Sequence, residues 1–66
     1  MLKVIEVLSE SNDSWEDATK QAVSETAKTV KNIRSCYVQE MSTVIKDNAI
    51  TKFRVNLKIS FEVERP

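Results

Sequence analysis

One cysteine, Cys36, carries the most reactive side chain in this sequence. A cysteine nucleophile is usually activated by a neighbouring base such as histidine, and the sequence contains no histidine. Cys36 alternates with Val38 in a stretch that favours a strand, so the two side chains point to the same face. A buried cysteine packs as a small apolar residue, and this is the role we expect. No other group of residues forms a catalytic constellation, and the chain is predicted not to be an enzyme.

A cluster of oxygen-bearing side chains could bind a cation. Its members precede or begin the predicted helix: Glu10, Asn12, Asp13, Glu16 and Asp17. Calcium takes several such oxygen ligands, but this spacing matches no calcium-binding loop. Acidic and polar side chains at a helix start also cap the helix and interact favourably with its dipole, which is the simpler interpretation. The sequence does not identify the ligands of a metal site.

An aromatic ring and a row of cations are the remaining candidates for ligand contacts. Trp15 lies on the apolar side of the predicted helix, where packing against the sheet or a neighbouring subunit is a simpler role than stacking on a ligand. Lys52, Arg54 and Lys58 occupy alternate positions and would share the polar face of one strand. Nucleic-acid-binding sheets interleave aromatic rings with such cations, and this face has none. We expect solvent, another subunit or an anionic small molecule there, and no nucleic acid.

The composition excludes several classes of protein. Ten Lys and Arg balance ten Asp and Glu, so no net field attracts the chain to nucleic acid or to a membrane surface. No stretch approaches the roughly 20 apolar residues of a membrane span. Glycine is absent, which excludes phosphate-binding loops, dinucleotide-binding turns and EF-hand loops. The unpaired cysteine suits a reducing compartment, and we expect a soluble, cytoplasmic protein.

Three strands are predicted to position these residues. The first covers about seven residues at 2–8, and the second covers 35–44. A hairpin turn is expected at 46–49, because Asp and Asn tolerate the left-handed backbone conformation that glycine usually takes. The third strand covers 53–64, where apolar and polar residues alternate strictly. This alternation predicts one buried face and one polar face.

A single helix of about twenty residues is predicted between the first two strands. Asp13 or Ser14 is the expected N-cap, and the acidic residues after it suit the helix dipole. Lys28, Lys31 and Arg34 are expected at its C-terminal end. Apolar residues recur at helical spacing and form one stripe: Trp15, Ala18, Ala22, Val23, Ala27, Val30 and Ile33.

The predicted order is therefore β-α-β-β, an α+β domain over residues 1–66 with one long helix on a three-stranded antiparallel sheet. The strand at 53–64 should span about 40 Å, whereas a compact chain of this length has a diameter of about 28 Å. A chain of 66 residues is also near the lower limit for a self-sufficient core. Neither a disulfide nor an ordinary zinc site is available, so we expect a homo-oligomer that covers the rest of the strand.

Three segments resemble the dodecin family in order and spacing: "KVIEVLSES…SWEDATKQAV", "KTVKNIRSCYVQE" and "FRVNLKISFEVE". The resemblance extends over essentially the whole chain, although no single motif is diagnostic. It implies a β-α-β-β fold whose sheet curls around its helix, with twelve copies forming a hollow spherical shell. Flavin-binding members hold riboflavin or FMN in stacked pairs between subunits, and they store flavin without turning over a substrate.

The residues that the resemblance implies for flavin binding are changed here. The family tryptophan that stacks on the flavin falls on Ser35, and the glutamine that hydrogen-bonds the ring edge falls on Arg54. Stacking on an aromatic ring contributes roughly 1–3 kcal/mol, so its loss predicts weaker flavin binding. Arg54 retains donors for a carbonyl or a phosphate, and Tyr37 follows Ser35 on the same strand face as an alternative ring in a shifted position. A branch of the family with these changes has been assigned a calcium-binding role.

The leading hypothesis is a non-enzymatic homo-dodecamer that binds a small ligand between subunits, with flavin as the family default. Ser35, Arg54 and Tyr37 are its candidate ligand-binding residues. The alternative is a calcium-binding or purely structural shell that has lost flavin. A third hypothesis is an adaptor domain that binds a protein or a nucleic acid through the polar face of the third strand, which a monomeric mass in solution would favour.

Overall fold

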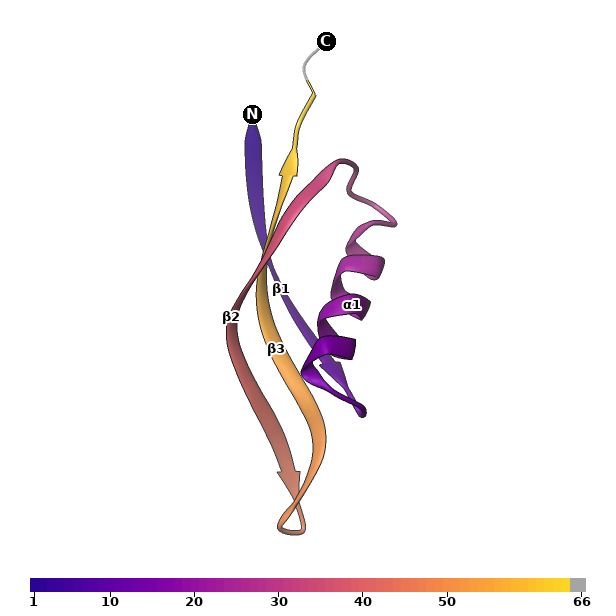
Figure 1. Ribbon diagram of the computed structural model, residues 1–66, viewed down its shortest axis with the longest axis vertical. Helices are drawn as coiled ribbons and strands as arrows, with labels where there is room; N and C mark the ends of the chain where they lie inside the picture. Colours follow the sequence, from indigo (N-terminus) through magenta and orange to yellow (C-terminus); the bar gives the residue numbers. More distant parts are fainter. Residues whose placement is uncertain (65–66) are drawn as a thin grey trace.

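The computed structural model describes residues 1–64. Four elements follow one another, β1 (Leu2–Ser11), α1 (Trp15–Thr26), β2 (Ile33–Lys46) and β3 (Ala49–Glu62). The strands form one sheet in the order β1-β3-β2, with both pairings antiparallel. Helix α1 lies against one side of this sheet (Figure 1). The predicted α+β class and the β-α-β-β order are confirmed.

All three strands are longer than predicted, and β3 runs from Ala49 to Glu62 in place of the predicted 53–64. Strand β1 has 10 residues and β2 has 14, because cross-strand pairing with β3 extends both beyond their apolar stretches. Ser9, Glu10 and Ser11 are polar and looked like part of a turn, yet they pair with β3 residues from Val55 to Phe53. The backbone hydrogen bonds to β3 therefore set the ends of these strands, and the side-chain pattern did not indicate them.

The N-terminus of α1 agrees with one of the two predicted caps. Ser14 is the N-cap, with extended backbone, and its Oγ accepts a hydrogen bond from the Asp17 backbone N–H at 2.9 Å. Glu16 and Asp17 stand in the first turn, where negative charge interacts favourably with the helix dipole. The Asp17 carboxylate does not return to the cap residue and instead accepts from the Ser11 hydroxyl at 2.6 Å.

The prediction of a helix of about twenty residues is wrong. Helix α1 has 12 residues and ends at Thr26, with no basic residue in its last turn. The Val30 backbone N–H still reaches the Thr26 carbonyl at 2.9 Å. Asn32 then takes a positive φ of 62° and turns the chain into β2. Ile33 therefore begins a strand, and the helical spacing of the later apolar residues was coincidental.

The core lies between α1 and the central strand. Val55, Leu57 and Ile59 of β3 are 0% exposed, and they meet Ala18 and Ala22 of the helix. The two alanines let the helix approach the sheet closely. Each fully buried Val, Leu or Ile stabilises the fold by about 1.5–3 kcal/mol. The alternating pattern of β3 thus correctly predicted its buried face.

The molecule is elongated, which explains the length of β3. Its principal extents are 53 × 19 × 13 Å and its radius of gyration is 13.6 Å, so the expected compact diameter of about 28 Å is wrong. The β1 register ends where Ser11 pairs with Phe53, and beyond that point β2 and β3 pair only with each other. We call this segment, residues 44–52, the hairpin arm; it projects past the helix in Figure 1.

The hairpin arm ends in the predicted turn. Lys46 pairs with Ala49, and the two residues between them, Asp47 and Asn48, have φ of 52° and 62°. Positive φ at both central residues is what a two-residue type I′ turn requires. Among residues 1–64, no helix is sufficiently long and apolar to cross a membrane.

Candidate functional site

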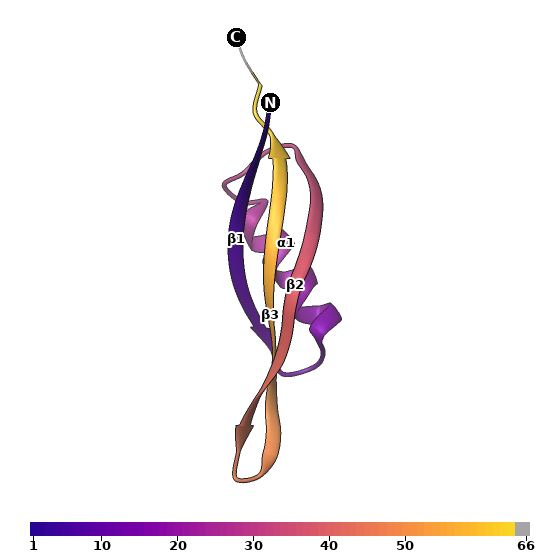
Figure 2. The same ribbon diagram turned by 90° about the vertical axis from the view of Figure 1, so that its left-hand side faces the viewer.

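One side of the sheet faces away from α1, and we call it the outward face (Figure 2). Side chains alternate along a strand, so the residues between the buried members of β3 lie on this face. Their cross-strand partners share it. It consists of Leu2, Val4, Glu6, Leu8 and Glu10 of β1, Lys52, Arg54, Asn56, Lys58, Ser60 and Glu62 of β3, and Ser35, Tyr37, Glu40, Ser42 and Val44 of β2.

All three residues predicted to contact a ligand lie on the outward face, but the chain brings only two of them together. Ser35 pairs with Ser60, and Tyr37 pairs with the neighbouring outward residue Lys58. Arg54 lies six positions along β3 from Ser60, which corresponds to roughly 20 Å. One chain therefore does not gather Ser35, Tyr37 and Arg54 around a single small ligand, and their ligand-binding role stays a prediction.

The polar surroundings of Ser35 and Tyr37 differ. The Ser35 hydroxyl is hydrogen-bonded to the Ser60 hydroxyl across the strands. The Tyr37 side chain is 65% exposed, so its ring is free to meet another molecule on this face. The position at which the resemblance implies a stacking ring thus holds a short hydroxyl that is bonded within the sheet.

The strongest charge interaction on the outward face joins Arg54 to Glu10. Arg54 donates a hydrogen bond from Nε to Glu10 Oε2 at 2.8 Å, and its Nη2 forms an ion pair with the same oxygen at 2.6 Å. Lys52 Nζ lies 3.6 Å from the other oxygen, Glu10 Oε1. The hydrogen bond from Arg54 is the main cause that lowers the pKa of Glu10, and Lys52 adds to it. We call these three residues the charge triad.

The sequence did not reveal the charge triad. Glu10 was grouped with the acidic residues that follow it, as a candidate cation ligand. In the structure its partners come from the opposite end of the chain, because β1 and β3 are antiparallel neighbours that pair Glu10 with Arg54. Opposite charges on two segments would have indicated this pair only if the register had been known.

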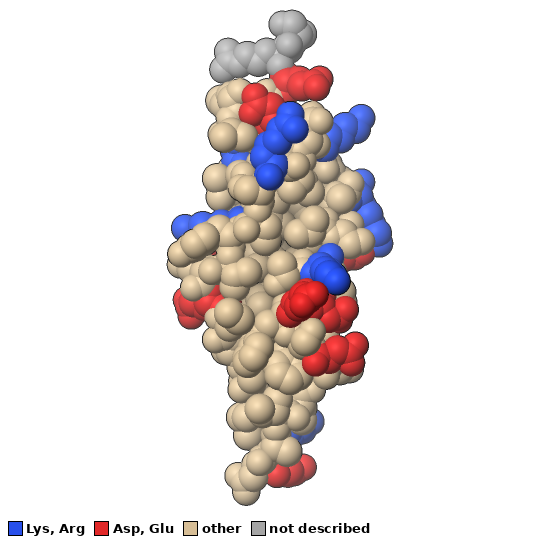
Figure 3. All heavy atoms as spheres, viewed as in Figure 1, with Lys and Arg blue, Asp and Glu red and all other residues tan. Residues whose placement is uncertain are grey.

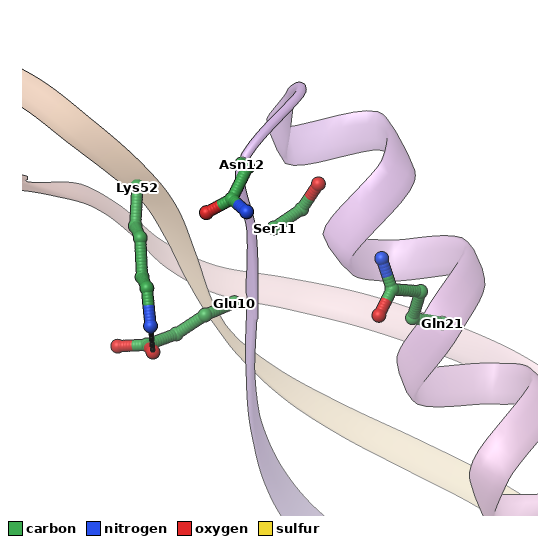
Figure 4. Close-up of a pocket in the computed structure, with 5 residues that line it drawn as sticks. All are labelled: Glu10, Ser11, Asn12, Gln21 and Lys52. Atoms are coloured by element: carbon green, nitrogen blue, oxygen red, sulfur yellow. Dashed lines mark ion pairs between the residues drawn. The ribbon is translucent and has the colours of Figure 1, made fainter.

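Two concavities lie beside Glu10. One, of about 470 Å³, is lined by Leu8, Ser9, Glu10 and Arg54. The other, of about 270 Å³, lies at the end of β1 and is lined by Glu10, Ser11, Asn12, Gln21 and Lys52. Figure 4 shows Lys52 reaching the Glu10 carboxylate on one side of β1, with Gln21 of α1 on the other. Glu10 is the residue that both concavities share.

The acidic cluster does not form a metal site within the chain. Three of its members have separate partners, since Glu10 binds Arg54, Glu16 pairs with Lys20, and Asp17 accepts from Ser11 and from Gln21. These hydrogen bonds, that of Ser11 above all, lower the pKa of Asp17. Within residues 1–64 no group of three Cys, Asp or Glu side chains is placed to hold a metal ion. The capping role is the one that the structure supports.

Trp15 and Cys36 both pack against other side chains of the fold. The Trp15 ring meets Phe53 edge-to-face with centroids 5.1 Å apart, and its Nε1–H donates to the Ser42 carbonyl at 2.9 Å. Trp15 therefore anchors the start of α1 to the sheet. Cys36 is partly buried and packs against the core, and desolvation raises the pKa of its thiol. A raised thiol pKa disfavours the thiolate that a nucleophile needs.

Apolar side chains remain uncovered in two regions. On the outward face of β1, Leu2, Val4 and Leu8 are 59–70% exposed. On the hairpin arm, Ile45 and Ile50 form an exposed cross-strand pair, and the surface around the arm is largely uncharged in Figure 3. Contiguous uncovered apolar side chains mark surfaces that meet another molecule. The two regions lie on different strands and at different heights of the sheet.

Comparison with known proteins gives one consistent family. The family model described as Dodecin matches residues 1–64. The calcium dodecin of Mycobacterium tuberculosis is 31% identical over 61 residues, which are 92% of this chain and 86% of that protein.

Solved structures of the same family have the same fold. The crystal structure of calcium dodecin from M. tuberculosis, described as a calcium-chelating antigen with a calcium-binding site, has a TM-score of 0.86 and 29% identity. That match covers 100% of this chain and 97% of the other. The dodecin of Streptomyces coelicolor has a TM-score of 0.94 and 26% identity, covering 100% of this chain and 94% of the other.

Proposed function

Because this chain belongs to the dodecin family, we propose that it is a non-enzymatic protein that assembles from twelve identical copies and binds a small ligand between them. The observation that carries the assembly is the uncovered apolar surface on β1, where Leu2, Val4 and Leu8 stand 59–70% exposed. Burying one such side chain contributes about 1.5–3 kcal/mol, and in a homo-oligomer the contribution recurs in every copy.

The two separate apolar regions support a closed shell over a simple dimer. A two-fold dimer uses one self-complementary patch, whereas a larger closed assembly uses at least two different patches on each copy. The outward row of β1 and the hairpin arm supply two such patches on one chain. Asn56 on the outward face also has a buried side-chain oxygen with no partner within residues 1–64, as a group completed by assembly would.

Calcium is the ligand that we propose first. The relative at 31% identity is described as a calcium dodecin. One chain gathers no group of three acidic or thiol ligands among its described residues, so we place the ion between copies, where oxygens of several chains can meet. Calcium binding should then depend on assembly.

Flavin is the second candidate, favoured by the family and by the exposed ring of Tyr37. The predicted contact positions are Ser35, Tyr37 and Arg54. Against it, Ser35 offers no ring, and its hydroxyl is bonded to Ser60. The Arg54 guanidinium is held by Glu10. We expect flavin to bind weakly, if at all, relative to calcium.

Native mass spectrometry tests the assembly, and titration calorimetry tests the ligand. A chain of 7.5 kDa should give a dodecamer of about 90 kDa. Calcium should then produce saturable heat with the assembled protein, with magnesium as the control ion. A monomeric mass would contradict the proposal as a whole. If the assembled protein gives no heat of calcium binding but quenches riboflavin fluorescence saturably, flavin would replace calcium as the proposed ligand.

A further inference from the structure

The charge triad is the strongest polar feature of the outward face. The Arg54 guanidinium meets one carboxylate oxygen of Glu10 twice, through a hydrogen bond from Nε at 2.8 Å and through an ion pair with Nη2 at 2.6 Å. The second oxygen lies 3.6 Å from the Lys52 ammonium. Charge-assisted bonds of this kind are about twice as strong as neutral ones. A single carboxylate therefore holds the two cations at this end of the face.

This arrangement is not an automatic result of cross-strand pairing. Glu6 pairs with Lys58 in the same two strands and on the same face, yet no ion pair within 4.0 Å joins them among the ion pairs of residues 1–64. Glu6 and Glu10 thus lie on the same strand and the same face, but of these two only Glu10 forms ion pairs. The pair provides an internal control.

The triad borders two concavities beside β1, at the edge of the sheet. Glu10 lines both the 470 Å³ concavity, which it shares with Arg54, and the 270 Å³ concavity, which it shares with Lys52. An anionic group that enters either concavity meets a carboxylate whose charge already compensates the nearest cation. It must displace Glu10 from Arg54 or Lys52 and leave that carboxylate without a partner. A charged residue that repels one class of ligand can make a site specific for another class.

We infer that Glu10 is a specificity-determining residue that excludes anionic, phosphate-bearing ligands from Arg54 and Lys52. The inference rests on the proposed function only in taking the outward face as the ligand-contacting surface. Neutral and cationic small molecules are unaffected by this exclusion. Without Glu10, the same two cations become a site for a phosphate group.

The experiment compares FMN with riboflavin, which share one ring system and differ by the phosphate. Fluorescence quenching is titrated at pH 8 with wild type, Glu10→Gln, Glu6→Gln and the double variant Glu10→Gln/Arg54→Gln, each checked for its native mass. We expect Glu10→Gln to bind FMN about tenfold more tightly than wild type, with riboflavin changed less than twofold. Added salt should reduce this gain, since exposed charges are screened. Glu6→Gln should behave as wild type, and the double variant should lose most of the gain.

Equal FMN binding by wild type and Glu10→Gln would overturn the inference, as would an equal gain for riboflavin or for the Glu6→Gln control. If Glu10→Gln fails to fold, Glu10→Ala replaces it under the same criteria. The proposed function fails on different readouts, namely the native mass of the wild type and its calcium heat. The two failures are therefore distinguishable.

Discussion

The two faces of β3 are made by alternating residues of one strand, but different features of the sequence and fold set the surroundings of each face. On the inner face, Val55, Leu57 and Ile59 are 0% exposed beneath α1. On the outward face, Arg54 and Lys58 are exposed, and their partners come from β1 and β2. Apolar alternation specifies the inner face within one segment. The outward face depends on strand register, which brings together residues from three strands.

The most disruptive test places charge on the inner face. Leu57→Asp puts a carboxylate under α1 with no partner, and it should cost more than about 4 kcal/mol, which prevents folding and assembly. Circular dichroism and native mass would show the loss. Lys58→Asp, which introduces the same residue one position away on the outward face, should still fold. A soluble, fully assembled Leu57→Asp variant would contradict the assignment of the two faces.

The next test places the same charge on the uncovered apolar row. Leu8→Asp should leave the chain folded, because Leu8 is 70% exposed, but it should shift the native mass from about 90 kDa to smaller species. The loss is about 1.5–3 kcal/mol in each copy. Ser24→Asp on the exposed side of α1 is the control and should leave the mass unchanged. If Leu8→Asp also assembles fully, this row is not an interface.

Restoring the family's flavin contacts tests whether the outward face keeps its pocket. Ser35→Trp with Arg54→Gln should tighten riboflavin binding by about one to two orders of magnitude, as one stacked ring contributes roughly 1–3 kcal/mol. Fluorescence quenching measures the effect. Ser35→Leu with Arg54→Gln is the control without a ring. Unchanged binding in the tryptophan variant would mean that the surrounding geometry has diverged as well.

A smaller effect is expected from the helix cap, which supports the inner face alone. Ser14→Ala removes the acceptor for the Asp17 backbone N–H and should lower the free energy of unfolding by about 0.5–2 kcal/mol. Chemical denaturation would report it, and the exposed Ser24→Ala is the control. Ligand binding by the folded protein should not change. Equal stability of both variants would show that the cap contributes nothing measurable.

The smallest effect is a pH dependence at the same helix start. Hydrogen bonds from Ser11 and Gln21 lower the pKa of Asp17 below its ordinary value of 3.8. The ionised carboxylate therefore stabilises the folded chain above that value, and this contribution is lost as the pH falls through the lowered pKa. In acid denaturation, Asp17→Asn should flatten the loss of stability below about pH 4. An unchanged acid slope would mean that these hydrogen bonds do not favour the ionised form.

The sequence predicted the features that depend on near neighbours. The alternation of β3, the turn at Asp47 and Asn48, and the cap at Ser14 all follow from local chemistry and were found. The helix length was wrong because α1 already ends at Thr26. Asn32 then adopts a left-handed conformation that leads into the strand at Ile33, and apolar spacing reveals neither feature.

The candidate site was harder to predict than the fold. Ser35, Tyr37 and Arg54 came from a family resemblance, and the chain places Arg54 far from the other two along β3. Glu10 was read as part of an acidic cluster, because its contact with Arg54 joins residues that are distant in sequence. Contacts formed across strands leave no periodic signal in the sequence.

The central place of β3 in the sheet also orders the events of folding. The β2–β3 hairpin closes through a two-residue turn, whereas β1 pairs with β3 across most of the chain, from Ser11↔Phe53 to Leu2↔Glu62. Closing such a long loop costs more entropy and is slower than forming a hairpin. The hairpin should therefore form first, and β1 should dock onto it with α1. Since β1 carries the row of Leu2, Val4 and Leu8, the proposed assembly through that row should follow the docking of β1.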